Sequence, residues 1–138
     1  MDIGVVVVTH GQLAAELVNA AETIVGDLPR FAAVSIGWHE DVEDARAEIR
    51  AAIERVRGPK GVLILTDMFG GTATNVALPF LDPDRVEVVT GTNLPMLVKL
   101  ASIRCLDLPL HELAQRLTAA GQKSIRVASE FLKRREPS

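Results

Sequence analysis

The sequence predicts a single α/β domain built on a doubly wound, mainly parallel sheet with helices on both faces. Its 138 residues and 48% hydrophobic content suffice for one domain with a buried core. Short apolar runs without polar alternation are typical of strands covered on both faces. Each run is followed by a stretch whose apolar residues recur at helical spacing. We therefore treat residues 1–138 as one domain.

The first unit sets the pattern. A β-branched run over residues 3–9 ends at His10 and Gly11, and an amphipathic stripe over 13–25 predicts a helix. Further strands are expected at 31–36, 61–66 and 86–90, each followed by a helix, at 42–57, 73–80 and 94–103. Four consecutive strand-then-helix units predict parallel pairing with right-handed crossovers.

The end of the chain, residues 120–138, is less regular. A helix is expected from Leu110 to about Ala120, where Gly121 breaks it. Residues 124–128 alternate like a half-buried strand, whereas residues 128–135 have helical character. The pattern alone leaves the structure of this tail open.

Composition excludes several classes of function. A net charge of −3 without a basic stripe argues against nucleic-acid binding, and no apolar run approaches the ~20 residues that span a bilayer. The single cysteine, Cys105, predicts a reducing compartment, hence the cytoplasm, and we expect its thiol to pack in the core. Neither metal-ligand spacing nor a nucleotide-binding fingerprint occurs, so we expect no metal and no cofactor.

Polar residues follow the first and third strands. His10 and Asp67 would meet at the carboxyl edge, because these two strands commonly flank the switch point of such a sheet. A carboxylate accepting one ring N–H leaves the other nitrogen free to attack. The backbone amides of Gly70 and Gly71 and the hydroxyl of Thr72 can hold phosphoryl oxygens. The pattern predicts that His10 accepts a phosphoryl group.

Each residue also has a structural explanation on its own. His10 would serve as a loop residue, Asp67 as a helix N-cap, and paired glycines mark many loops. Their convergence at one edge favours the functional interpretation. His39 and His111 lack such a setting, and we expect them at the surface.

Three linked motifs resemble the mannose-family enzyme IIA domains of the bacterial phosphoenolpyruvate:sugar phosphotransferase system. They are VTHG at 8–11, LTDMFGGTATN at 65–75 and GTNLPML at 91–97. The resemblance implies that His10 is phosphorylated by the carrier protein HPr and passes the phosphoryl group to an enzyme IIB histidine. It further implies that Asp67 hydrogen-bonds the His10 ring and that Thr72 lies near the phosphoryl group. It also implies a homodimer that exchanges a C-terminal strand, which would employ residues 124–128. Ala73 departs from the proline that is frequent in the family.

An apolar patch around the histidine would suit a transient protein partner. We expect Met68, Phe69 and Met96 to supply it if they are exposed. Two alternatives to sugar-uptake transfer stay open. One is a stand-alone regulatory module whose phosphorylation state controls binding to a target, which the length of the chain allows. The other is hydrolysis of a small phosphate ester by His10.

Overall fold

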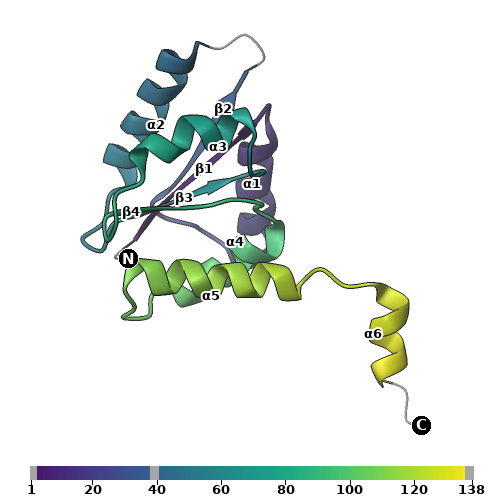
Figure 1. The fold of residues 1–138 in the computed structure, drawn as a ribbon. Helices are drawn as coiled ribbons and strands as arrows, with labels where there is room; N and C mark the ends of the chain where they lie inside the picture. The colour runs from purple at the N-terminus through teal and green to yellow at the C-terminus, as the bar shows by residue number, and fades with distance from the viewer. Residues whose placement is uncertain (1–2, 38–40, 136–138) are drawn as a thin grey trace.

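The computed structural model describes residues 3–37 and 41–135 and contains one parallel sheet (Figure 1). Its strands run in the order β2-β1-β3-β4, and every neighbouring pair is parallel. The strands are β1 (Gly4–His10), β2 (Phe31–Ile36), β3 (Val62–Thr66) and β4 (Val86–Val89). The predicted neighbours, the first and third strands, therefore lie side by side at the centre of the sheet.

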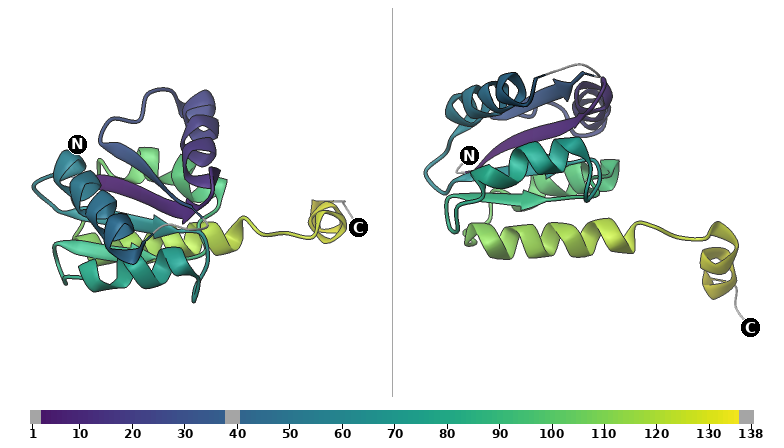
Figure 2. Two further views of the ribbon diagram at one scale, coloured as in Figure 1. Left: turned by 90° about the horizontal axis from the view of Figure 1, so that it is seen from above. Right: turned by 45° about the horizontal axis from the view of Figure 1, so that its top comes forward.

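Helices cover both faces of this sheet (Figure 2). One face packs against α1 (Leu13–Val25), α4 (Leu94–Ile103) and α5 (Leu110–Lys123). The other packs against α2 (Val42–Val56) and α3 (Thr72–Ala77), which continues into the 3₁₀ turn η1 (Leu78–Phe80). Val5 and Val7 of β1 point into the first core and Val6 and Val8 into the second. Two buried faces explain the lack of polar alternation and confirm the doubly wound α/β class.

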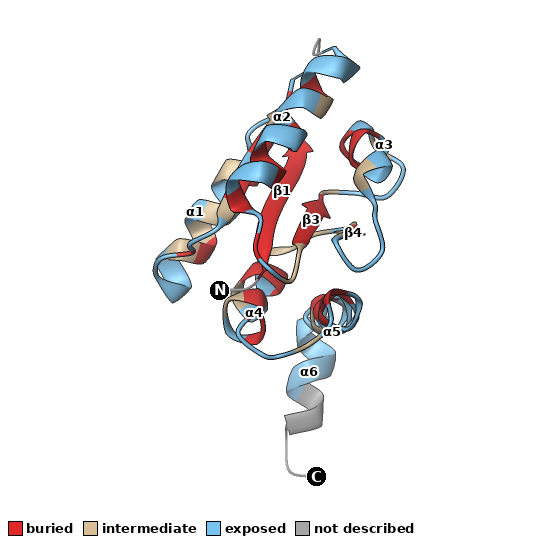
Figure 3. Cartoon of the chain, turned by 90° about the vertical axis from the view of Figure 1, so that its left-hand side faces the viewer, coloured by how far each residue is buried: buried red, intermediate tan, exposed pale blue. Residues whose placement is uncertain are grey.

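Burial decreases from the centre of the sheet outward (Figure 3). Strands β1 and β3 are buried throughout, apart from His10, whereas β2 alternates and β4 is half-buried. The register pairs Val8 with Thr66, so β1 and β3 end together at one edge. His10 is the last residue of β1, rather than a residue of the following turn.

The structure describes the tail that the sequence pattern left open. Residues 125–127 have no regular structure, and α6 (Ala128–Arg135) stands away from the body (Figures 1 and 2). Ile125 and Val127 are 76% and 60% exposed. Gly121 does not end α5 but lies inside it, because it packs against α4: a Cβ there would come within 2.6 Å of Met96 Sδ.

Cys105 is exposed, so the prediction of a core thiol was wrong. Its neighbour Arg104 takes the buried position at the end of α4 instead. The Arg104 guanidinium lies 4.8 Å from the centroid of the Phe31 ring, and this cation–π contact compensates part of its desolvation. Among the described helices, none has both the length and the apolar character needed to cross a membrane.

Candidate functional site

The site is built on a contact between His10 at the end of β1 and Asp67 directly after β3. Oδ2 of Asp67 lies 2.7 Å from His10 Nδ1 and also accepts the backbone N–H of His10 at 2.9 Å. A carboxylate oxygen in this position favours the tautomer with the proton on Nδ1 and leaves Nε2 free. The imidazole is exposed while Asp67 is largely enclosed. The structure thus brings together the two residues that the sheet topology predicted to meet.

The charge of Asp67 is stabilised in place. Partial burial on its own raises the pKa of this carboxyl, but hydrogen bonds from the backbone and ring of His10, the charge of that ring and the backbone N–H of Met68 lower it below 3.8 overall. Met68 N–H donates to the second oxygen, Oδ1, at 2.9 Å. Asp67 therefore stays ionised at neutral pH and does not cap α3, whose N-cap is Gly71.

Gly71 lies directly beside the imidazole. A Cβ at this position would stand 3.1 Å from Cε1 of His10 and 3.0 Å from Cγ of Met68. The absence of a side chain here lets the loop approach the ring. Gly70 has a φ of 81°, in the region that favours glycine, and Thr72, the first residue of α3, is exposed. The predicted phosphoryl-binding segment is thus adjacent to the histidine.

Three buried threonines that the sequence did not single out hold the surroundings of this pair. Thr9 Oγ1 accepts the N–H of Ala14 at 2.7 Å and so fixes the start of α1. Oγ1 of Thr66 and Oγ1 of Thr74 lie 2.6 Å apart, and Thr74 Oγ1 donates to the carbonyl of Met68. Threonines at strand ends and in a first helical turn carry little signal in sequence, because their partners here are backbone groups and another hydroxyl, which residue type and spacing do not reveal.

The exposed apolar residues at this edge agree only in part with the expected docking patch. Met68 and Phe69 are 54% and 79% exposed, and Leu13, the first residue of α1, is also exposed. Met96 is only 3% exposed, so its assignment to the patch was wrong. It faces inward from α4 because the helix turns that position toward Gly121 and the core.

Other candidate positions lie away from the site. His111 is exposed, as expected, and pairs with Glu87 on β4 through Nδ1 at 3.0 Å. His39 lies outside the described residues. Within the residues that the structure describes, no cluster of three His, Cys, Asp or Glu side chains is arranged to hold a metal ion.

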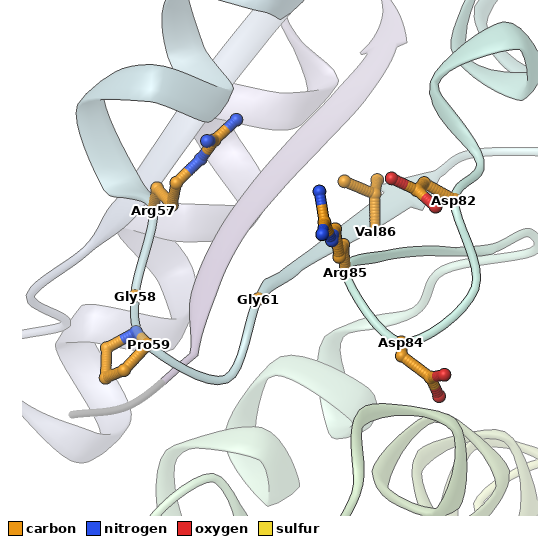
Figure 4. A pocket seen from close by; sticks show the side chains of 8 residues that line it. All are labelled: Arg57, Gly58, Pro59, Gly61, Asp82, Asp84, Arg85 and Val86. Carbon is orange, nitrogen blue, oxygen red and sulfur yellow. The ribbon is translucent and has the colours of Figure 1, made fainter.

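A hollow at the opposite edge of the sheet does not belong to this site (Figure 4). It lies between the segments that lead into β3 and β4, at the amino ends of the strands, whereas His10 is at the carboxyl ends. Arg57, Asp82 and Arg85 are among its lining side chains. All three are exposed, so this hollow is an open surface feature.

Comparison with known proteins gives one consistent result. A family model named EIIA-man, described as the fructose IIA component of the phosphotransferase system (PTS), matches residues 4–118. The chain is 32% identical over 133 residues to the PTS fructose-specific EIIA component of Bacillus subtilis, covering 96% of this chain and 90% of that one. It is 31% identical to the mannose-specific EIIAB component of Escherichia coli, covering 91% of this chain but only 39% of that longer protein.

Solved structures agree with these relatives. A PTS IIA protein associated with the fucose utilization operon of Streptococcus pneumoniae superposes with a TM-score of 0.82 at 28% identity, over 96% of this chain and 97% of that one. The mannose/sorbose-specific IIA subunit from Enterococcus faecalis superposes with a TM-score of 0.78 at 29% identity. The match covers 92% of this chain and 95% of that one. By fold and sequence, this chain belongs to the mannose-type EIIA family of the phosphotransferase system.

Proposed function

We propose that the chain is a phosphoryl carrier: His10 Nε2 accepts a phosphoryl group from phospho-HPr and passes it to a histidine of an enzyme IIB domain. The observation that carries this proposal is the 2.7 Å contact between Asp67 Oδ2 and His10 Nδ1. It directs the free lone pair to Nε2 of an imidazole whose side chain is 46% exposed. The relay uses the imidazole itself and needs no separate cofactor.

In the proposed step, the Nε2 lone pair attacks the phosphorus of the donor's phosphohistidine. The new N–P bond forms as the donor's N–P bond breaks, and the electron pair of the broken bond stays on the donor nitrogen. His10 keeps its Nδ1 proton, so the phosphorylated ring carries a positive charge that the carboxylate of Asp67 stabilises. The same exchange with an enzyme IIB histidine as nucleophile discharges the ring.

The loop after Asp67 is proposed to hold the transferred group. Phosphoryl transfer depends mainly on positioning and on charge stabilisation. Gly71 already lies within contact of the imidazole, and Gly70 and Thr72 flank it. Their backbone N–H groups and the Thr72 hydroxyl are the donors that we assign to the phosphoryl oxygens.

Met68 and Phe69 are proposed to contact the protein partners. Both side chains project from the same loop that approaches the ring, and both are largely exposed. An apolar patch next to the reacting nitrogen excludes water while the two proteins are in contact, which limits hydrolysis. We also assign Leu13, the exposed first residue of α1, to the surface that meets the partners.

Phosphorylation with phosphoenolpyruvate, enzyme I and HPr tests the proposal. The wild-type chain should take up label that is acid-labile and alkali-stable, and His10→Ala should take up none. His111→Gln is a matched control, because His111 is also an exposed histidine with a carboxylate partner. Labelling of His10→Ala at the wild-type rate would refute the proposal, as would turnover of small phosphate esters without any partner protein.

A second stage separates sugar uptake from the regulatory alternative. Both share phosphorylation of His10 and differ in the fate of the phosphoryl group. Transfer of label from the chain to a purified enzyme IIB domain supports uptake. Retention of label, combined with a target protein that binds only one phosphorylation state, supports the regulatory module.

The location and assembly are part of the same proposal. An exposed free thiol at Cys105 is compatible with a reducing compartment, and we place the chain in the cytoplasm with its protein partners. We also propose a homodimer in which residues 124–128 of one copy pair with the sheet of the other. The exposed apolar side chains of Ile125 and Val127 support this assembly.

A further inference from the structure

We propose that Thr74 is a positioning residue for phosphoryl transfer: its hydroxyl holds the segment that carries Asp67, and through Asp67 it sets the orientation and tautomer of His10. This inference rests on the proposed function. Thr74 lies in the first turns of α3, touches no reacting atom, and is completely buried.

The hydrogen bonds of Thr74 fix the chain on both sides of Asp67. Its Oγ1 lies 2.6 Å from the carbonyl oxygen of Met68, the residue after Asp67, and 2.6 Å from Oγ1 of Thr66, the residue before it. A carbonyl only accepts, so the single Thr74 hydroxyl proton goes to Met68. Thr66 must then donate to Thr74. One buried hydroxyl thus connects the residues on either side of Asp67 to α3.

Thr92 restrains the same segment from the other side. Its backbone N–H and its Oγ1 both donate to the carbonyl of Thr66, at 3.0 and 2.7 Å. Thr66 is therefore held through its side chain by Thr74 and through its carbonyl by Thr92. Asp67 directly follows Thr66, which is held by two hydrogen-bonding partners.

The segment beyond Asp67 has little else to hold it. Met68, Phe69 and Gly70 are exposed, so apolar burial contributes little to their order. The Thr74–Met68 bond is the side-chain bond that returns this exposed stretch to the buried part of α3. Without the hydroxyl, the Met68 carbonyl and the Thr66 hydroxyl lose a buried partner, and the segment shifts to restore those bonds.

Such a shift acts on His10 because Asp67 Oδ2 accepts two bonds from it, at 2.7 and 2.9 Å. Moving the carboxylate weakens its hold on Nδ1–H and lets the proton populate Nε2, the nitrogen that must attack. A misplacement of about 1 Å costs up to about 100-fold in rate. We expect the loss in the maximal rate of transfer, with little change in the KM for HPr.

The test compares Thr74→Val, which removes the hydroxyl at nearly constant shape, with Thr74→Ser, which keeps it. We expect Thr74→Val to lower the maximal rate of phosphorylation by phospho-HPr at least about tenfold and Thr74→Ser to stay within about twofold of wild type. Nitrogen chemical shifts of the His10 ring should show the Nε2–H tautomer gaining population in Thr74→Val alone. Thr23→Val is the control, because the Thr23 hydroxyl bonds only to its own helix.

A second pair guards against misfolding of the valine variant. Thr74→Ala and Thr74→Ser both lack the methyl group and differ only in the hydroxyl. Wild-type rate and an unchanged tautomer in a folded Thr74→Val or Thr74→Ala would overturn the inference. The tautomer is measured without any partner protein, so a wild-type chain that is never phosphorylated would refute the proposed function and leave the Thr74 measurement intact.

Discussion

At His10, one carboxylate oxygen of Asp67 accepts two hydrogen bonds, one from the ring N–H at Nδ1 and one from the backbone N–H of the same residue. Asp67→Asn removes the negative charge of the carboxylate. The amide can also present an N–H group to the His10 N–H groups, which need an acceptor. We expect the rate of His10 phosphorylation to fall at least about 100-fold, as in other sites where the acid partner of a histidine is neutralised. Rapid-quench labelling measures this rate. Asp41→Asn, at the N-cap of α2, should leave it unchanged.

The lowered pKa of Asp67 also predicts a pH dependence of stability. The folded chain binds fewer protons at this carboxyl than the unfolded chain, so its stabilising contribution is complete above the unfolded pKa, about 4. That contribution is lost as the pH falls through the lower, folded value. Urea unfolding between pH 7 and pH 3 should show a smaller loss of stability in Asp67→Asn than in wild type. Equal losses in the two proteins would contradict the expected contribution of Asp67.

Gly71 offers a steric test of the same ring. In Gly71→Ala the new Cβ would lie 3.1 Å from His10 Cε1 and 3.0 Å from Met68 Cγ, so the flexible methionine yields and the imidazole is displaced by a few tenths of an ångström. We expect about a tenfold lower rate of phosphorylation and an unchanged fold. Gly37→Ala, at the same edge of the sheet with open space around its Cβ, is the matched control. Equal activity of both variants would show that the ring has room to move.

Sequence reasoning found the two central residues because the rule that placed them is topological. Parallel strands end at a common edge, so His10 and Asp67 met once the first and third strands were neighbours. Met96 was misplaced because membership of a loop motif does not tell which way a helical side chain points. Thr74 was missed because its partners, a carbonyl and another hydroxyl, leave no trace in residue type or spacing.

Among the elements, the start of α4 connects the site edge to the C-terminal region. Asn93 caps α4 through Oδ1 on Met96 N–H at 3.1 Å, while its amide donates to the carbonyl of Gly121 at 3.2 Å. The same amide also donates to Ser124 Oγ at 3.4 Å. Asn93→Ala removes all three bonds, so we expect the free energy of unfolding to fall by about 2 kcal/mol. Asp41→Ala, which loses only an exposed cap bond to Glu43 N–H, should cost about 1 kcal/mol. Urea denaturation compares them, and equal losses would show that the bond to Gly121 contributes nothing.

Hydrophobic periodicity predicted the strands and helices up to residue 103, because burial on both sides of the sheet directly constrains residue type. Hydrophobic periodicity gave wrong predictions where tertiary packing determines the end of a helix or the burial of a side chain. Gly121 continues α5 because only a glycine fits against Met96, and Cys105 is exposed because Arg104 takes the buried position against Phe31. Neither contact has a local signal.

At the scale of the whole molecule, the sheet ends in an edge strand and the C-terminal tail carries exposed apolar side chains. Among the described strands, β4 pairs only with β3, so its second edge is free. A hollow runs along that edge between β4 and α5, with Val88, Val89, Ala114 and Gln122 among its lining residues. The tail leads away from the body (Figure 2). It carries the exposed apolar residues Ile125 and Val127. In the proposed homodimer, the alternating segment of one copy would pair with this edge of the other.

This complementarity predicts a dimer that depends on Ile125 and Val127. Changing both to serine removes the apolar side chains expected to enter the hollow, which at about 2 kcal/mol for each buried side chain weakens association well over tenfold. Sedimentation equilibrium should show a concentration-dependent dimer for wild type and a monomer for the double variant at the same concentration. Ile24→Ser is the control, because Ile24 is 59% exposed on α1, away from the tail. A wild-type monomer at all concentrations, or a double variant that dimerises as tightly as wild type, would rule out pairing through residues 124–128.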